Sequence, residues 1–377
     1  MLGFIISFYL ILMQKRISSI KSYWKSLFFI SGISFLVSLP ISIYYFYQLN
    51  ISSIVLNLLF VPLISTIIFP LSLLTFLFPF LDFLLLMITN LMEQLATFCH
   101  HYFLLKTIWM KPSIIWILFY YITLTFVLFT RKKIFILCLI GILCYQYFHL
   151  TLFPKTFFLM IDVGQGDSLL IHSRGQTMLI DTGGKITYQK EKWQQRKVKS
   201  LSETTLIPLF KSLGIKKLNY LVLSHGDFDH VGEAMNLIHN IKIENVIFNE
   251  GNFNSQEVKI IELLKQKKIP YTIAKKDNHY QVGKFELISL NSTWDNENDS
   301  SIVFLMKIQD YQFLLMGDSS TKVEEKVIQE YRLDQIDFLK VGHHGSKTST
   351  SSKFISKVKP QMALISVGLN NRYQHPS

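Results

Sequence analysis

The sequence predicts a polytopic bundle of α-helices in a membrane, followed by a layered αβ domain. Half of the 377 residues are hydrophobic and only 17% are charged, which is too apolar for an ordinary soluble protein. The apolar residues are concentrated before about residue 153, whereas the remainder has the composition of a globular domain. We therefore expect two domains, at residues 1–154 and 155–377.

The first domain contains segments long enough to cross a bilayer, which takes about 20 mostly apolar residues. Four segments meet this requirement, and they are Leu27–Tyr47, Ile54–Phe78, Ile114–Thr130 and Ile134–Phe153. A fifth candidate, Phe80–Leu105, is interrupted by polar residues that include Asp82 and Glu93. Residues 1–13 are apolar but short. We expect about five spans and a short N-terminal segment, with the fifth candidate packed in the bundle, lining a cavity or lying at the interface.

The net charge of +12 is explained largely by membrane topology. Lys15, Arg16, Lys21 and Lys25 precede the first full span, and Arg131–Lys133 precede the last. Both basic clusters lie in the cytoplasm under the positive-inside rule, provided that the fifth candidate also crosses. The last span then runs outward, and the second domain is expected outside the cytoplasm. The three cysteines form no CxxC pattern and do not indicate a redox compartment.

The second domain alternates strand patterns with helical patterns. An apolar meander comes first, with strands at Phe157–Val163, Ser168–His172 and Thr177–Ile180 that are separated by glycine turns. Further strands are predicted at Leu218–Leu223, Val246–Asn249, Tyr271–Ala274, Phe285–Leu290, Ile302–Ile308, Gln312–Met316, Phe338–Val341 and Met362–Val367, and helices at Ser202–Leu213, Gly232–Asn240, Ser255–Lys267 and Lys322–Tyr331. Strands with helices between them indicate a layered αβ domain.

Three of these strands end in residues that bind metals. The strand ends carry His225, Asp227, Asp229 and His230 in the first case, Asp318 in the second, and His343 and His344 in the third. Neutral imidazole and carboxylate are the ligands that hold Zn²⁺ or Mn²⁺. Because the three strand ends can meet at one rim of a sheet sandwich, they predict a centre for one or two divalent ions.

A basic segment, Lys185–Ser200, follows the meander. It contains six Lys or Arg residues among glutamines and aromatic residues. One interpretation is a solvated surface loop. The other is a loop that grips a nucleic-acid strand, in which Lys192 binds phosphate and Trp193 stacks on a base.

The ordered motifs of the second domain resemble those of a known family. The segments DVGQGDSLLI, LIDTGG, HGDFDHVGE, NDSSIVF, FLLMGD and KVGHHGSKTS occur in this order from about residue 157 to the C-terminus. They look like the metallo-β-lactamase-fold domain of the ComEC-type DNA-internalisation competence proteins. NLLFVPLIS at Asn57–Ser65 resembles the membrane competence region of the same family. The resemblance implies an αβ/βα four-layer fold for the second domain.

The resemblance also implies roles for individual residues. His225 and Asp227 hold one metal, Asp229 and His230 hold the other, and Asp318 bridges them. His344, with His343 as its neighbour, adds a ligand, and Asp181 supports the ligands from behind. The substrate contacts implied are Asn298, Ser300, Ser346 and Tyr373, and a terminal NxYxHP pattern adds Asn371 and His375. His375 acts as an acid or a phosphate contact, so the implied catalytic residues are Asp229, Asp318 and His375.

The chain departs from the family pattern at two places. Asp227 stands where the wider superfamily has histidine, and no clear histidine between Asp229 and Asp318 fills the third ligand motif. We therefore expect the first metal site to be weak, exchangeable or absent. The chain also starts inside the membrane region and stops at Ser377, where the family continues, so we expect a truncated version of a longer protein.

The function expected from the resemblance is DNA uptake during natural transformation. The chain would be a multi-pass cell-membrane protein whose outer domain is a metal-dependent nuclease that degrades the strand not imported. Its partners would be single-stranded DNA, membrane lipids and other components of the uptake machinery. Two alternatives remain open: a membrane-anchored hydrolase of another phosphoester, and a transport subunit or fragment without catalytic activity.

Overall fold

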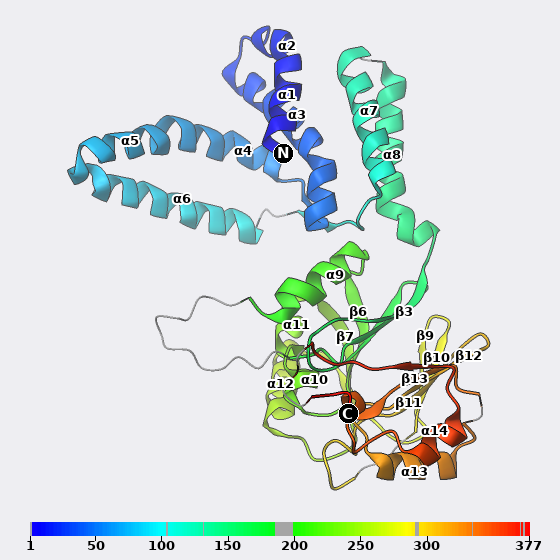
Figure 1. Ribbon diagram of the computed structural model, residues 1–377. Coiled ribbons are helices and arrows are strands. Elements are labelled where there is room, and N and C mark those ends of the chain that lie inside the picture. The colour runs from blue at the N-terminus through cyan, green and yellow to red at the C-terminus, as the bar shows by residue number, and fades with distance from the viewer. Residues whose placement is uncertain are drawn as a thin grey trace. The chain divides into compact units, whose positions relative to one another are not determined.

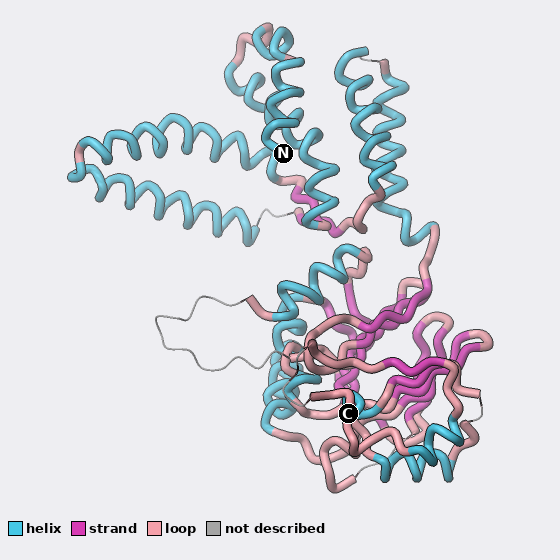
Figure 2. The backbone as a smooth tube through the Cα atoms, viewed as in Figure 1, coloured by secondary structure: helices cyan, strands magenta, loops and turns pink. Residues whose placement is uncertain are grey.

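The computed structural model describes residues 2–102, 105–130, 132–184, 199–290, 294–333, 335–369, 371 and 374–377. These residues form two compact units (Figure 1). The first comprises Met1–Phe148 with Lys211–Gly214, and the second comprises His149–Phe210 with Ile215–Ser377. Helices dominate the first unit and strands the second (Figure 2).

The first unit is helical, with one short pair of strands. Its helices are α1 (Leu2–Leu12), α2 (Gln14–Ser18), α3 (Tyr23–Phe46), α4 (Ser53–Pro62), α5 (Phe69–Leu77), α6 (Asp82–Tyr102), α7 (Ile114–Thr130) and α8 (Lys133–Leu152). The strands β1 (Gln48–Asn50) and β2 (Lys106–Ile108) pair antiparallel. A π-helical stretch, Leu63–Ile68, joins α4 to α5 directly after Pro62. Proline has no backbone N–H to donate, so Pro62 disturbs the regular hydrogen-bond pattern of the helix at this point.

Within the described residues, four helical segments are long and apolar enough to cross a membrane, and they are Tyr23–Phe46, Ser53–Leu77, Pro79–Cys99 and Lys133–Leu152. Helix α7, predicted as a full span, has 17 residues and falls short of that length. Its Trp116, Tyr120, Leu124 and Leu128 are buried at a spacing of four residues, so α7 forms part of the core of this unit.

The burial of the candidate spans is uneven. In Tyr23–Phe46, 39% of the most apolar window is buried, whereas the values for Ser53–Leu77 and Pro79–Cys99 are 6% and 0%. Figure 1 shows α5 and α6 side by side as an extended hairpin. The apolar side chains of the hairpin are therefore not buried within this chain, and they require a surrounding apolar medium or other protein to cover them.

Two six-stranded sheets form the second unit. The first has the order β3-β4-β5-β6-β7-β8, with β3 Thr156–Met160, β4 Leu169–Ser173, β5 Gln176–Ile180, β6 Lys217–Leu223, β7 Lys242–Asn249 and β8 Tyr271–Ala274. The second has the order β14-β13-β12-β11-β10-β9, with β9 His279–Val282, β10 Phe285–Ser289, β11 Phe304–Ile308, β12 Tyr311–Leu315, β13 Phe338–Lys340 and β14 Met362–Leu364. Strands β5 to β8 are parallel, as are β12 to β14, so their carboxyl ends share one edge in each sheet.

The alternation of side chains along the strands builds four layers. In β11, Phe304 and Met306 belong to the core between the sheets, whereas Leu305 faces a second core. That second core contains Val323 of α13 (Thr321–Glu330) and Phe354 of α14 (Ser352–Val358). On the outer face of the other sheet lie α10 (Phe228–Val231), α11 (Ala234–Asn240) and α12 (Ser255–Lys267) (Figure 1). The predicted αβ/βα four-layer fold is confirmed.

In the second domain, the predicted strands agree with the structure apart from a few boundaries, and one further strand is present. Strand β9 was not predicted, because HYQV is short and polar, and its residues alternate in exposure at the edge of the sheet. It pairs with β10 through a turn in which Gly283 has a φ of +61°. The predicted helix Gly232–Asn240 corresponds to α11, and a separate short helix that was not predicted, α10, precedes it and carries part of the predicted metal motif.

Candidate metal centre

The carboxyl ends of the parallel strands bring the predicted ligands together. His225, Asp229 and His230 follow β6 and continue into α10. Asp318 follows β12, and His344 lies in a single turn of 3-10 helix, Gly342–Gly345, after β13. Residues from both sheets therefore meet at one rim of the sandwich. His225, His230 and His344 are almost completely buried, as is Asp318.

The distances between donor atoms in this cluster fit one metal ion. Oδ2 of Asp318 lies 3.3 Å from Nε2 of His230 and 3.3 Å from Nε2 of His344. Nε2 of His344 lies 3.4 Å from Oδ2 of Asp229. A tetrahedral ion with bonds of about 2.0–2.1 Å holds its ligand atoms roughly 3.3–3.4 Å apart. Contacts of this length link Asp229, His230, His344 and Asp318 in a chain, and we call these four residues the inner cluster.

The predicted ligands have unpaired atoms of the kind that a metal requires. Among the described residues, Nε2 of His225, His230 and His344 and Oδ1 of Asp318 are buried without a hydrogen-bond partner. A buried polar atom without a partner is unfavourable unless an ion or water satisfies it. The donor set therefore fits a divalent metal ion.

Hydrogen bonds fix the tautomers that leave these nitrogens free. Nδ1 of His344 lies 2.8 Å from the carbonyl oxygen of Ser366, which can only accept, so Nδ1 carries the proton. Nδ1 of His230 lies 2.9 Å from Oδ2 of the buried Asp181 and donates to it in the same way. In each neutral ring, Nε2 then keeps its lone pair for a metal.

Ser224 extends the influence of Asp181 to His225. Its hydroxyl donates to Oδ2 of Asp181 at 2.6 Å and lies 3.1 Å from Nδ1 of His225. Because the hydroxyl proton is used on the carboxylate, the oxygen accepts from Nδ1, and Nε2 of His225 is left free. Asp181 also accepts from the backbone N–H of Ser224 at 2.7 Å. One carboxylate thus orients two imidazoles, one directly and one through a hydroxyl.

Three residues of the centre have a strained backbone. His343, His344 and Asp181 have φ values of 44°, 54° and 60°. Residues other than glycine seldom adopt this left-handed region, and they do so mainly where the surroundings enforce it. Gly166, with a φ of +111°, packs so closely on the backbone of Asp229 that a Cβ there would lie 2.0 Å from its carbonyl oxygen.

Opposite charges in the inner cluster shift the pKa values of its histidines and carboxylates. Burial disfavours the protonated form of His230, but the carboxylates of Asp318 and Asp181 outweigh it and raise the pKa of His230 well above 6.5. Burial acts likewise on His344, and hydrogen bonding to Asp229 and Asp318 raises its pKa to about 9. Burial raises the pKa of Asp318, yet the neighbouring imidazoles lower it well below 3.8. Since a metal binds neutral imidazole, binding near pH 7 releases protons.

A second group of donors, which we call the outer cluster, shares two residues with the first. It consists of His225, His230 and Asp318, whose ligand atoms lie within 4.8 Å of one another. Asp227 belongs to none of the candidate groups found in the described part of the chain. Its side chain is 43% exposed, and its Oδ2 lies 3.6 Å from Nε2 of His225. The structure therefore brings His225 to the centre and leaves Asp227 at its solvent edge.

The other predicted residues lie around the centre with local partners. Nδ1 of His343 lies 3.1 Å from the hydroxyl of Thr348, and the hydroxyl of Ser346 accepts from the Thr348 backbone. The buried hydroxyl of Ser300 donates to the carbonyl oxygen of Trp294, so it closes a turn. Asn298 lies on the same turn, and its backbone N–H donates to Asn296.

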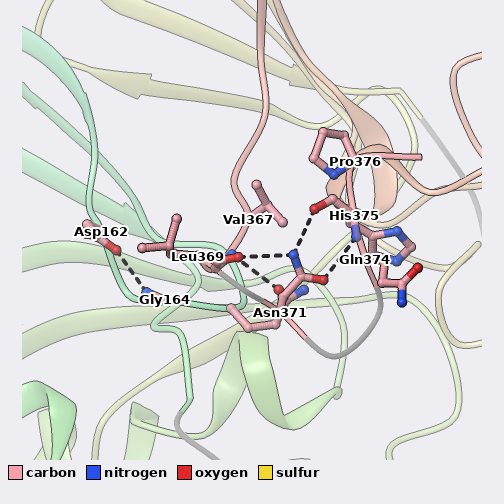
Figure 3. Close-up of a pocket in the computed structure, with 10 residues that line it drawn as sticks. Asp162, Gly164, Val367, Leu369, Asn371, Gln374, His375 and Pro376 are labelled. Carbon is pink, nitrogen blue, oxygen red and sulfur yellow. Dashed lines mark hydrogen bonds between the residues drawn. The ribbon is translucent and has the colours of Figure 1, made fainter.

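A cavity of about 840 Å³ lies between the glycine turn after β3 and the C-terminal segment (Figure 3). It is lined by Asp162, Gly164, Gln165, Val367, Gly368, Leu369, Asn371, Gln374, His375 and Pro376. The side chain of Asn371 hydrogen-bonds to the backbone of Gly368 and His375 and holds this segment together. The ring of His375 lies 6.1 Å from that of His343, so the cavity borders the metal centre. Lys192, Trp193 and Tyr373 lie outside the described residues.

Sequence reasoning missed three residues of the centre. Ser224 immediately precedes the motif, and its role depends on a contact across two strands. Asp167 ends the GQGD turn and is 2% exposed, with Oδ1 lying 3.7 Å from Nδ1 of His344. Lys340 is completely buried and forms an ion pair with Asp167. A lysine within the apolar strand FLKV was the signal available in the sequence for Lys340.

This centre on a four-layer sandwich is that of a metallohydrolase-type domain. Residues 161–368, more than half of the chain, match the metallo-beta-lactamase superfamily, and the chain belongs to that superfamily. Residues 1–134 match the competence protein family. The combination confirms the resemblance to the ComEC-type competence proteins, and with its candidate spans the chain is a membrane protein.

Individual relatives agree with this assignment. The chain is 32% identical to ComE operon protein 3 of Bacillus subtilis over 100% of its own length and 51% of that protein. It is 33% identical to Recombination protein 2 of Haemophilus influenzae, over 57% of this chain and 25% of that one. The chain therefore spans about half or less of these relatives. Among solved structures, Igni18, a metallo hydrolase of Ignicoccus hospitalis, is 13% identical with a TM-score of 0.35, over 55% of this chain and 81% of that one.

Proposed function

We propose that the chain takes part in DNA uptake during natural transformation, and that its second domain is a metal-dependent phosphodiesterase acting on single-stranded DNA. The observation that carries the proposal is the inner cluster, whose four residues are linked by three donor-donor contacts of the length expected around one metal ion. The competence relatives support DNA as the substrate. In this proposal residues 1–154 are the membrane competence region and residues 155–377 the catalytic domain.

In the proposed phosphodiester cleavage, some residues bind the metal, others orient the metal ligands, and one contacts the phosphate. A divalent ion, Mn²⁺ or Zn²⁺, supplies Lewis-acid stabilisation of the charge on the phosphate. Asp229, His230, His344 and Asp318 would hold it. Asp181 keeps His230 in the required tautomer, and the carbonyl oxygen of Ser366 does the same for His344. Asp318 is shared with the outer cluster, where His225 completes a second, weaker position. His375, on the border between the centre and the cavity, contacts the phosphate or gives a proton to the leaving oxygen.

The proposed topology follows from charge. If α3, Ser53–Leu77, Pro79–Cys99 and the 17-residue α7 all cross the membrane, the basic residues before α3 and before α8 both lie in the cytoplasm, and α8 leads outward. The second domain then works on the outer face of the cell membrane, where it degrades the strand that is not imported. Its partners are DNA, membrane lipids and further components of the uptake machinery.

A second candidate function uses the same centre. A membrane-anchored hydrolase of another phosphoester, such as a wall polymer, needs the same metal ligands. A transport subunit that only contacts DNA needs none of them, and the buried, unpaired Nε2 atoms favour a metal centre.

The full chain in detergent micelles tests the proposal, with 5′-labelled single-stranded DNA and added Mn²⁺ or Zn²⁺. We expect cleavage that EDTA abolishes and that both Asp229→Ala and Asp318→Ala abolish. Asp310→Ala, which removes an exposed carboxylate, is the matched control and keeps the activity. Intact DNA together with hydrolysis of bis(p-nitrophenyl) phosphate would favour another phosphoester. Cleavage that survives both ligand variants would reveal a contaminating nuclease.

A further inference from the structure

Lys340 is a buried cation behind the ligands of the metal centre. It ends β13, and its side chain is 0% exposed. Its ammonium group forms an ion pair with Oδ2 of Asp167 and donates to the carbonyl oxygen of Gly317 at 3.2 Å. It also lies 4.0 Å from Oδ1 of Asp318. A lysine is almost never fully buried unless it is paired, and here the charged groups around it are acids of the centre.

The partner of Lys340, Asp167, could itself be a metal ligand. Four groups of side chains in the described part of the chain have the spacing of a metal site. Two of them include Asp167, once with Asp181 and His230 and once with Asp318 and His344. The remaining two are the outer cluster and three members of the inner cluster, Asp229, His230 and His344. Geometry alone therefore allows a cation on either side of His230 and Asp318.

The ammonium group of Lys340 already holds a position on the Asp167 side. The ammonium group forms a buried ion pair with the Asp167 carboxylate and lies 4.0 Å from Oδ1 of Asp318, so it occupies the place that a metal ion bound by Asp167 would need. A metal ion bound by Asp167 would place a second positive centre close to this ammonium group. The repulsion between two cations in a dry interior is strong, since water does not screen it.

We propose that Lys340 acts as a built-in cation, which neutralises Asp167 and confines metal ions to the inner and outer clusters. The pair also positions two ligands. Lys340 holds the carbonyl oxygen of Gly317, next to Asp318, and Asp167 lies against Nδ1 of His344. Lys340 is therefore a positioning residue that determines how many ions the centre accepts. The proposal rests on the metal centre alone and is independent of the substrate.

The proposal predicts that removing the ammonium group opens a site. In Lys340→Met, the Asp167 carboxylate is left buried without its cation, and a metal ion takes that place. In the double variant Lys340→Met with Asp167→Asn, no charge remains to attract an ion. Lys357→Met, an exposed lysine on α14, is the matched control.

The experiment measures metal content rather than activity. The full chain and each variant, in detergent micelles, are dialysed to equilibrium against Mn²⁺, and bound manganese per chain is determined by mass spectrometry. We expect Lys340→Met to bind one ion more than the wild type, and the double variant and Lys357→Met to match the wild type. Mn²⁺ should also raise the melting temperature of Lys340→Met more than that of the wild type, because the ion replaces a lost charge.

Two results would overturn the proposal. A folded Lys340→Met chain with the same manganese content as the wild type would mean that the ammonium group excludes no ion. A double variant that binds one ion fewer than the wild type would mean that Asp167 is itself a metal ligand. If Lys340→Met does not fold, the double variant decides alone: wild-type content supports the proposal, and a lower content refutes it.

Discussion

The inner and outer clusters share His230 and Asp318 but differ in how completely the protein surrounds an ion. The inner cluster adds Asp229 and His344, and its donor atoms lie 3.3–3.4 Å apart. The outer cluster adds only His225, because Asp227 stays at the solvent edge. Two adjacent metal sites formed by one sequence motif can therefore differ in affinity, because one side chain of the motif is not placed as a ligand.

The largest effect is expected from the residue that both clusters share. Asp318→Asn removes one negative charge from two metal positions, and we expect phosphodiester cleavage to fall by about 1,000-fold or more. Initial rates on single-stranded DNA measure the change. Asp310→Asn, an exposed carboxylate after β11, should stay within about twofold of the wild type. Equal losses in both variants would contradict the role of Asp318.

Two neighbouring histidines provide the next test. His344→Ala removes a ligand of the inner cluster, and we expect Mn²⁺ affinity to fall by roughly 100-fold. His343→Ala removes a ring that contacts Thr348, and affinity should change by less than about threefold. Isothermal titration of both variants compares them directly. The assignment of His344, and not His343, as the metal ligand would be wrong if His343→Ala weakened Mn²⁺ binding as much as His344→Ala.

The pKa of His344 predicts how the metal-free chain responds to pH. Its value in the folded chain, about 9, lies above the ordinary value of 6.5. The resulting stabilisation is complete below pH 6.5 and is lost as the pH rises to about 9, a change on the order of 2–3 kcal/mol. Melting temperatures of the EDTA-treated chain should fall across this range, and His344→Ala should lack that part of the decrease. A wild-type curve that rises from pH 6.5 to 9 would refute the assignment.

The smallest effect is expected at Ser224, which acts only through its neighbours. Ser224→Ala breaks the link between Asp181 and His225 but leaves the direct bond from His230. We expect about a tenfold loss of affinity at the outer cluster and little change at the inner one. Competition titration with a chromophoric chelator distinguishes the two sites. Loss confined to the inner cluster would show that the tautomer argument is wrong.

Much of the fold was predictable from the sequence, because apolar runs and glycine turns mark the strands. The membrane part and the four layers were predicted from composition and from the ordered motifs. Strand β9 was missed because an edge strand needs little apolar surface. In the centre, the positions of His225, Asp229, His230, Asp318 and His344 at strand ends indicated that they could meet.

The remaining features depend on contacts that spacing along the chain does not reveal. Asp167 and Lys340 are far apart in sequence and meet only when the two sheets pack together. Asp227 lies between two residues of the centre, yet its side chain is 43% exposed and belongs to none of the candidate metal groups of the described residues. The order of residues in a motif therefore does not determine which of them reach an ion.

The central claim, that the inner cluster is the principal metal site, is tested most directly by a Mn²⁺ titration followed by electron paramagnetic resonance. The full chain in detergent is compared with His225→Ala and His344→Ala. We expect the tightest binding step to persist in His225→Ala and to disappear in His344→Ala. Loss of that step in His225→Ala, with retention in His344→Ala, would contradict the account.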